Sequence, residues 1–482
     1  MRPTRPSAVQ IAAWTDDSGA RAALGRRARS KLIATWWSYV MDTPSFLKRL
    51  VGSVIPSEGR RAHRRARQVI ELFQSLLSQR GEVSGAVIAR DALAAYNALP
   101  KNARPSFYDS LAAEFTPNRA ELDEAYQAYR AQPTQAHLIR LQRCVEAPRQ
   151  ELFRRLNTAG DGTASLVAMR REVLSGLREN PQWAGIDSDL EHLFGSWFNR
   201  GFLTLERIDW YTPAVVLEKL IEYEAVHEIA GWHDLRRRLA ADRRCFAFFH
   251  AALPHEPLIF IEVAFTKGMS CAIEPLLALD APQIDPQTAD TAIFYSITNC
   301  QTGLRGISFG NLLIKQVAQR LGQEFPRIKT FATLSPIPGF RAWLNSQTED
   351  LKARPEGTAA VDAIGCLDQI DWHKTPALAE RLRKTLMPLA AWYLAYARRE
   401  NEAADAVARF HLGNGARLER LNWLADTSPR AVTNAAGIMV NYLYRLEDVE
   451  NNHELYVREQ KVAASRTLLR LADECPLAPR RT

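Results

Sequence analysis

The stretch TAIFYSITNCQTGLRGISFGNLLIKQVAQRL, Thr291–Leu321, indicates the fold because it combines a strand, a glycine-rich turn and a helix. Its first eight residues, Thr291–Thr298, are mostly aromatic, β-branched or small, which is typical of a buried strand. A helix is expected to begin near Asn311, because apolar residues then recur at helical spacing. Three glycines mark the turn between strand and helix: Gly303, Gly306 and Gly310.

The turn has the features of an anion-binding site. A strand-to-helix junction presents backbone N–H groups and the positive end of a helix dipole, and glycines let a phosphate approach the main chain closely. A tight turn without a ligand is the alternative. Neither Gly-x-Gly-x-x-Gly nor Gly-x-x-x-x-Gly-Lys-Ser/Thr occurs, which disfavours a dinucleotide fold and a nucleoside-triphosphate loop. The segment RGISFGN, Arg305–Asn311, instead resembles the pyrophosphate loop of acyl-CoA-binding acetyltransferase folds.

The rest of the chain divides into two parts. The length of 482 residues predicts two domains, and residues 1–189 contain only helical patterns. Residues 190–482 add five further apolar runs that predict strands, with a helical insertion at about 344–415, so that we expect an α+β fold with a mixed sheet. These runs begin at Cys245, Pro257, Ile328, Ala416 and Gly437.

Two helix boundaries in the first part follow from proline. Thr116 is expected to cap a helix that has Pro117 at its first position, and Pro148 is expected to bend or split a helix over residues 137–156. The basic run RRAHRRAR, Arg60–Arg67, has no interleaved aromatic residues, so we interpret it as a solvated helix face.

The segment LSPIPGF, Leu334–Phe340, follows the next predicted strand. Ser335 lies at the carboxyl end of that strand, where sheets of this kind bind ligands. Pro336 and Pro338 have fixed φ angles, and Pro336 also restricts Ser335 to extended geometry. A simple strand terminator is the alternative to a rigidly held, functional hydroxyl.

His411 lies in FHLGNGARLERLNWLAD, beside a flexible turn that precedes a strand. An ordinary structural histidine is the alternative to a functional one. The other histidines form no metal-binding pattern, since His250 and His255 straddle Pro254 and no His-Glu-x-x-His occurs. A serine hydrolase is not supported, because Gly-x-Ser-x-Gly is absent.

Composition limits the class of protein. The net charge of +8 suggests an anionic partner, but we expect no nucleic-acid binding, and no apolar run is long enough to cross a membrane. The start of the chain lacks the apolar core of a secretory signal, and its two early aspartates argue against an organelle transit peptide. The six cysteines form no Cys-x-x-Cys pair, so we expect reduced thiols and a cytoplasmic location.

Taken together, several stretches resemble the malonyl-CoA decarboxylase family. They are LFGSWFNRGFLTLERIDWYTPAVVLEKLIEYEAVH from Leu193, FYSITNCQTGLRGISFGNLLIKQV from Phe294, LSPIPGF, FHLGNGARLERLNWLAD and NYLYRLED. The resemblance covers most of residues 190–457 in order. It implies a helical oligomerisation domain followed by an acetyltransferase-like (GNAT-type) catalytic domain, a homo-oligomer (dimer or tetramer), and conversion of malonyl-CoA to acetyl-CoA and CO2.

The resemblance also implies a set of site residues. Ser335 and His411 match the family's catalytic serine and histidine, and the remaining matches contact substrate: Ser296, Arg305, Gly306, Ile307, Ser308, Phe309, Gly310, Asn311 and Tyr444. Some relatives carry an acid where this chain has Ser308, so the resemblance carries over no role for that carboxylate. No metal and no cofactor are expected, because the thioester itself accepts the electrons released with CO2.

We hypothesise that His411 protonates the enolate carbon and that Ser335 binds the malonyl carboxylate or relays protons with His411. Tyr444 and a backbone N–H near Ser296 are candidates for the enolate oxygen. Two alternatives are an acyl-CoA-dependent acyltransferase on the same fold and a non-catalytic malonyl-CoA-binding protein. The first would require an acceptor for turnover, and the second would bind malonyl-CoA without consuming it.

Overall fold

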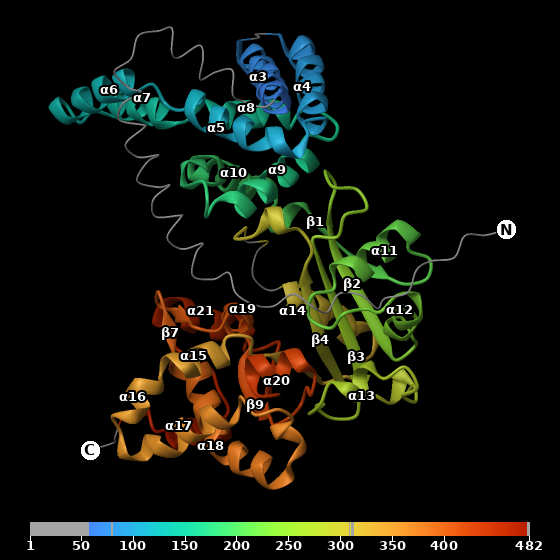
Figure 1. The fold of residues 1–482 in the computed structure, drawn as a ribbon. Helices are drawn as coiled ribbons and strands as arrows, with labels where there is room; N and C mark the ends of the chain where they lie inside the picture. The colour runs from blue at the N-terminus through green and yellow to red at the C-terminus, as the bar shows by residue number, and fades with distance from the viewer. Residues whose placement is uncertain (1–56, 79–80, 308, 310–312, 480–482) are drawn as a thin grey trace, which may run out of the picture.

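The computed structural model describes residues 57–78, 81–307, 309 and 313–479 (Figure 1). The predicted positions Ser308, Gly310 and Asn311 therefore lie outside the described residues, as does the amino-terminal segment 1–56. The first described part is helical. Its helices are α3 (Ser57–Ser78), α4 (Glu82–Asn97), α5 (Arg104–Glu114), α6 (Arg119–Ala131), α7 (Gln135–Val145), α8 (Pro148–Leu156), α9 (Gly162–Gly176) and α10 (Ala184–Trp197).

Two of the predicted helix boundaries can be compared with this part. The expected split occurs, because α7 ends at Val145 and α8 begins with Pro148 at its first position. The expected cap of α6 is wrong by two residues. Asn118, and not Thr116, is the N-cap, since Asn118 Oδ1 accepts hydrogen bonds from the N–H groups of Ala120 and Glu121. The asparagine side chain accepts from two N–H groups that have no partner within the helix. Pro117 has no such acceptor side chain, so it does not determine where the helix begins.

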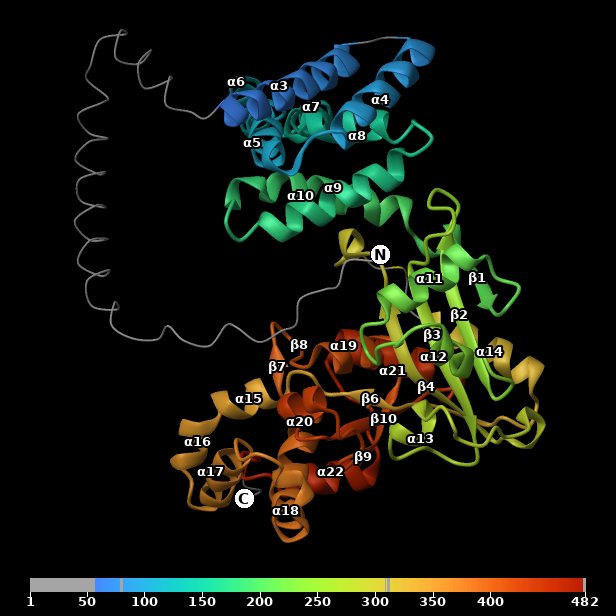
Figure 2. The ribbon, with the colours of Figure 1, turned by 45° about the vertical axis from the view of Figure 1, so that its right-hand side comes forward.

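An eight-stranded mixed sheet forms the centre of the second part (Figures 1 and 2). Its main path runs in the order β1-β2-β3-β4-β5-β10-β6, and β9 pairs with β10. The strands are β1 (Leu203–Ile208), β2 (Arg243–His250), β3 (Ile259–Thr266), β4 (Thr291–Asn299), β5 (Thr330–Thr333), β6 (Ser335–Pro336), β9 (Arg417–Asn422) and β10 (Met439–Leu443). Only β1, β6 and the short β7–β8 pair (Arg398–Arg399, Glu402–Ala403) were not separately predicted among the described strands.

The pair β4–β5 organises the site. These two strands are parallel, whereas the other pairs among the described strands of this sheet are antiparallel. Their pairing ends at Phe294 and Thr333, where β5 itself ends, while β4 continues to Asn299. A register shift against β3 leaves Tyr295 as an extra residue in β4, a bulge of the kind that re-aims neighbouring side chains. Ser296 and Ser335 thus lie just beyond the point where β4 and β5 part.

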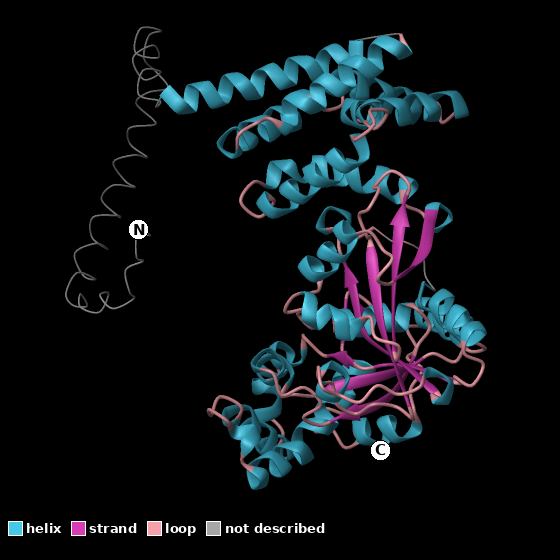
Figure 3. Ribbon diagram, turned by 90° about the vertical axis from the view of Figure 1, so that its right-hand side faces the viewer, coloured by secondary structure: helices cyan, strands magenta, loops and turns pink. Residues whose placement is uncertain are grey.

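Helices surround this sheet and extend beyond it (Figure 3). The helix α14 (Leu313–Glu324) buries the predicted stripe that includes Ile314, Val317 and Leu321. The predicted insertion consists mainly of helices. The other helices of this part are α11 (Ala214–Tyr223), α12 (Trp232–Arg238), α13 (Glu274–Leu277), α15 (Phe340–Ser346), α16 (Thr348–Lys352), α17 (Thr358–Cys366), α18 (Pro376–Tyr396), α19 (Ala406–Gly413), α20 (Pro429–Ala435), α21 (Val449–Glu459) and α22 (Arg466–Asp473).

The predicted α+β architecture, with a helical part followed by a mixed sheet, is confirmed. The domain boundary expected after residue 189 falls inside α10, and the first strand begins at Leu203. All six cysteines are free. None of the described helices is long and apolar enough to cross a membrane.

Candidate active site

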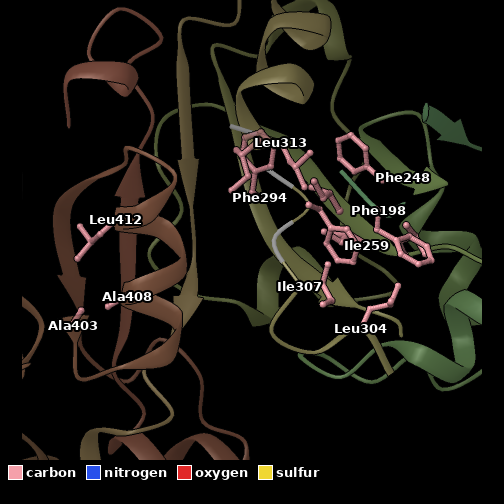
Figure 4. Packing of buried hydrophobic residues seen from close by; sticks show 14 of the residues in the cluster. Phe198, Phe248, Ile259, Phe294, Leu304, Ile307, Leu313, Ala403, Ala408 and Leu412 are labelled. Carbon is pink, nitrogen blue, oxygen red and sulfur yellow. The ribbon is translucent and has the colours of Figure 1, made fainter. Parts of the chain in front are cut away.

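The glycine-rich turn begins with the short 3-10 helix Thr302–Leu304 and continues to Ile307. Gly306 has a φ angle of +85°, which a residue with a Cβ adopts only with strain. Leu304 and Ile307 are buried, and Figure 4 shows both beside Ile259 of β3 within one hydrophobic cluster. Arg305 and Gly306 are exposed. The turn is therefore anchored by two apolar side chains and presents its backbone at the surface.

A cavity of about 400 Å³ lies against this turn. The predicted residues Arg305, Gly306, Ile307 and Phe309 line it, together with residues of β3, β4 and α14. Its remaining wall comes from Phe410 of α19 and from Asn414, the C-cap of that helix. Since Phe410 directly precedes His411, the cavity connects the predicted anion-binding turn with the helix that carries the predicted histidine.

Ser335 and His411 are in direct contact. Ser335 Oγ lies 3.0 Å from His411 Nε2, and the Ser335 hydroxyl donates to Thr333 Oγ1 at 2.8 Å. Thr333 Oγ1 also accepts from the backbone N–H of Tyr442, at 3.2 Å. Because the single proton of Ser335 goes to Thr333, the contact with His411 requires His411 Nε2–H to donate to Ser335 Oγ.

The second ring nitrogen of His411 contacts Tyr444. His411 Nδ1 lies 2.8 Å from the Tyr444 hydroxyl, and with the proton on Nε2 this nitrogen accepts the tyrosine proton. The imidazole also stacks on the Tyr442 ring, with centroids 4.4 Å apart and an interplanar angle of 26°. Thr333, Ser335, His411 and Tyr444 thus form one directed hydrogen-bond chain.

Burial determines the charge of this chain. His411 is 3% exposed, and desolvation lowers its pKa to about 3, so that the imidazole is neutral at physiological pH. Burial also raises the pKa of Tyr444 well above its usual value, which keeps that hydroxyl protonated. A neutral imidazole between two hydroxyl groups can exchange protons without placing a net charge in the core.

Asp405 fixes the helix that carries His411. As the N-cap of α19, its Oδ1 accepts from the N–H groups of Val407 and Ala408. Its Oδ2 accepts from the N–H of Gly339, in the segment that follows Ser335, at 3.0 Å. Burial raises the pKa of this carboxyl. One buried side chain therefore positions both elements of the Ser335–His411 contact.

Ser296 lies outside this hydrogen-bond chain. Its hydroxyl is buried at 2.9 and 2.8 Å from the two carboxylate oxygens of Glu224. Thr298 Oγ1 lies 3.4 Å from the same carboxylate. The structure thus brings Ser335, His411 and Tyr444 together, groups the described residues of the turn around the adjacent cavity, and places the Ser296 side chain against Glu224.

A second cavity, of about 710 Å³, lies against the segment that follows Ser335. Pro336, Ile337 and Pro338 line it, and so does Val407, one helical turn before His411. Its polar lining includes His227, Glu228, Glu274, Asp426 and Arg430.

Sequence reasoning missed Thr333, Asp405 and Tyr442. Thr333 had a usable signal, because residues two apart in a strand share a face and Thr333 precedes Ser335 by two. Asp405 carried the signal of an N-cap before a helix, but its contact with Gly339 depends on the fold. Among the described residues, no group of three or more histidine, cysteine, aspartate or glutamate side chains is arranged to hold a metal ion.

Comparisons with known proteins agree with this architecture. The family model for the malonyl-CoA decarboxylase C-terminal domain matches residues 201–478, and that for the N-terminal domain matches residues 115–198. Mitochondrial malonyl-CoA decarboxylase of Anser anser anser is 38% identical over 343 residues, which are 66% of this chain and 68% of that protein. The enzyme of the same name from Mus musculus is 35% identical over 345 residues, 66% of this chain and 70% of that protein.

Solved structures are similar over most of the chain. The crystal structure of malonyl-CoA decarboxylase from Rhodopseudomonas palustris has 48% sequence identity and a TM-score of 0.80, and the match covers 84% of this chain and 99% of that chain. The corresponding structure from Cupriavidus metallidurans has 35% identity and a TM-score of 0.66, with 86% and 100% covered.

Proposed function

The chain belongs to the malonyl-CoA decarboxylase family, and on this premise we propose that it converts malonyl-CoA to acetyl-CoA and CO2. The observation that carries the proposal is the Ser335–His411–Tyr444 hydrogen-bond chain, in which His411 directly follows Phe410 of the cavity at the glycine-rich turn. Decarboxylation of an acyl-CoA requires a group that delivers a proton and a nearby turn that binds the CoA nucleotide.

The reaction makes three demands on the protein. The malonyl carboxylate must be held out of the thioester plane, so that the electrons of the breaking C–C bond enter the carbonyl. The enolate oxygen must be stabilised, and a preorganised donor for such an oxygen contributes about 2.7–4 kcal/mol. The enolate carbon must then receive a proton, for which a positioned acid gives roughly 10²–10⁴-fold acceleration.

We assign the contact with substrate to Ser335 and the proton supply to His411. Both nitrogens of the His411 ring face hydroxyl groups, so His411 acts through Ser335 in this arrangement. When the Ser335 hydroxyl turns from Thr333 to the substrate and gives its proton to the enolate carbon, His411 passes its Nε2 proton to Ser335 Oγ while its Nδ1 takes the proton of Tyr444. The reaction consumes one proton from solvent, and that proton restores the Tyr444 hydroxyl. This assignment replaces direct protonation of the carbon by His411 and a contact of Tyr444 with the enolate oxygen.

For the nucleotide part of the substrate we propose the exposed backbone at Arg305 and Gly306. Gly306 leaves room for a phosphate, and the Arg305 guanidinium adds positive charge at the mouth of the cavity. The pantetheine arm would then run along the cavity past Phe410 toward Ser335. The predicted contacts of Ser308, Gly310 and Asn311 stay predictions.

The test is turnover by the purified full-length chain. Malonyl-CoA without any added acceptor should give acetyl-CoA and CO2 in equal amounts, measured by chromatography of the CoA esters and by trapped CO2. Malonyl-CoA that remains intact after prolonged incubation, despite measurable binding, would contradict the proposal and favour the non-catalytic binding protein.

The acyltransferase alternative is favoured by the second cavity. Its carboxylates Glu228, Glu274 and Asp426 would suit an amine acceptor near the serine segment. Measuring the products with and without an amine distinguishes the decarboxylase from the acyltransferase, because a transferase produces free CoA only when an amine is present. Release of CO2 at the same rate with and without amines would exclude that alternative.

We further propose that the chain acts as a homo-oligomer, dimer or tetramer, in the cytoplasm and in fatty acid metabolism. Large apolar side chains exposed on the helical part support oligomerisation, namely Val87, Tyr126, Ile139 and Val145. Light scattering coupled to size-exclusion chromatography tests the oligomer, and fractionation of the source cells tests the location.

A further inference from the structure

Arg170 of α9 connects the helical part to the glycine-rich turn. It is 2% exposed, and its NH1 group donates to two backbone carbonyls of the turn, Gly303 O at 3.1 Å and Arg305 O at 2.8 Å. Its Nε donates to Asp187 of α10 at 2.7 Å. A buried guanidinium that joins two helices to a turn 133 residues away along the chain holds that turn in one position.

Two glycines of the turn show how closely the helices approach. A Cβ on Gly303 would lie 2.0 Å from the backbone oxygen of Val167 in α9. A Cβ on Gly306 would lie 2.9 Å from Glu191 Oε1 in α10. Gly303 therefore has no space for a side chain against the α9 backbone, whereas Gly306 lies near the end of the flexible Glu191 side chain. In Figures 1 and 2 the turn lies directly beneath both helices.

The Arg170 contact also orients the backbone of the turn. A trans peptide group points its C=O and its N–H in opposite directions. Because the carbonyl of Arg305 faces Arg170, the N–H of Gly306 points to the opposite side of the turn. Arg305 and Gly306 also line the cavity, whose described lining contains no residue of α9 or α10. Arg170 thus determines which face of the turn offers its N–H group to an anion.

We propose that Arg170 is a positioning residue for the nucleotide phosphates of the acyl-CoA: the helical part, through Arg170, holds the phosphate-binding turn in its binding conformation. This inference rests on the proposed function, since it assigns the nucleotide to this turn. Arg170 itself does not contact the substrate. Its loss should therefore weaken binding of the nucleotide and leave the chemistry at Ser335 unchanged.

The chain offers a matched control in Arg149. This arginine is also buried in the helical part, donates from Nε to Asp189 of α10 at 2.8 Å, and donates to the Ala112 carbonyl. It forms no hydrogen bond with the turn among the described residues. Arg170→Met and Arg149→Met thus remove comparable buried ion pairs from neighbouring helices, and only the first releases the turn.

The experiment compares full-length variants with two substrates, malonyl-CoA and malonyl-pantetheine, and with CoA as a ligand. With Arg170→Met we expect the KM for malonyl-CoA and the Kd for CoA, measured by calorimetry, to rise at least about tenfold, with kcat within about twofold of wild type. The KM for malonyl-pantetheine, which lacks the nucleotide, should stay unchanged. Arg149→Met should lower the melting temperature but change neither constant. Should Arg170→Met fail to fold, Arg170→Lys and Asp187→Asn should show smaller shifts in the same direction.

Equal KM changes in the Arg170 and Arg149 variants would overturn the proposal, and so would an equal loss with malonyl-pantetheine. If the wild-type chain binds CoA without decarboxylating malonyl-CoA, the proposed reaction fails while the Kd comparison still decides the role of Arg170. If the wild-type chain binds no CoA, both proposals fail.

Discussion

His411 Nε2 lies 3.0 Å from Ser335 Oγ, although 76 residues separate the two positions in the chain. The intervening segment is mostly helical, and it returns the chain so that α19 packs beside β6. Asp405 ties these two elements together through the Gly339 N–H. The contact is therefore a product of tertiary structure, and its consequences can be measured.

We expect Ser335→Ala and His411→Ala each to lower kcat for malonyl-CoA by about 10²–10⁴-fold, because each interrupts the same proton path. The double variant should be no more than a few-fold slower than either single variant, as for groups that act as a unit. Steady-state rates of acetyl-CoA formation check this. Losses that multiply in the double variant would show that the residues act independently.

Tyr444→Phe removes the hydrogen bond to His411 Nδ1, and we expect kcat to fall about ten- to a hundredfold. Tyr442→Phe is the matched comparison, since the buried Tyr442 hydroxyl has no hydrogen-bond partner among the described residues while its ring stacks on the imidazole. Tyr442→Phe should therefore lower kcat less than Tyr444→Phe does. The reverse order would contradict the assigned tautomer.

The depressed pKa of His411 predicts a pH effect on stability. The folded chain holds His411 neutral down to about pH 3, whereas in the unfolded chain the imidazole takes up a proton near pH 6.5. The unfolded state therefore binds more protons between these values, and His411 lowers the free energy of unfolding as the pH falls from about 6.5 to 3. Urea denaturation at pH 7 and pH 5 should show a smaller pH-dependent loss in His411→Gln than in wild type.

His227 titrates in the same direction, because burial lowers its pKa to about 4. It remains in both proteins, so the difference between wild type and His411→Gln isolates His411. Identical pH dependence in the two proteins would contradict the burial effect on His411.

Asp405→Ala should reduce both stability and kcat, because it removes the cap of α19 and the anchor of Gly339. Loss of a helix cap alone costs about 0.5–2 kcal/mol. Asn118→Ala, which uncaps α6 in the helical part, provides the comparison, and it should lower stability without changing kcat. Asp405→Asn keeps one acceptor oxygen for the cap of α19 but places an NH2 group against the Gly339 N–H, so it should recover stability more than kcat. Equal kcat values for the two alanine variants would show that Asp405 acts only as a cap.

Local patterns were enough to predict much of the fold. The apolar runs predicted β2 to β5, β9 and β10, since buried strands are continuous in hydrophobic residues. The edge strand β1 was missed because its exposed residues include Glu206 and Arg207. Pro148 marked a helix start because its missing N–H is tolerated there, whereas Pro117 gave a false start next to a stronger cap, Asn118.

The sequence indicated which residues belong to the candidate site, but it did not indicate which of them form hydrogen bonds with one another. The prolines around Ser335 and the turn beside His411 indicated two special positions, and the family resemblance joined them. The partner of each ring nitrogen, and the contact of Arg170 with the turn, depend on which elements pack together. No short-range pattern contains that information.

The strand β10 has a consequence for synthesis of the protein. It pairs with β5, β6 and β9, and the tyrosines that contact His411 lie within it and directly after it. A growing chain can fold its helical part early, because those contacts are mostly between neighbours in sequence. The proton path cannot form until residue 444 has left the ribosome. The hydrogen-bond chain of Ser335, His411 and Tyr444 is therefore completed late in synthesis, after the glycine-rich turn has already been made.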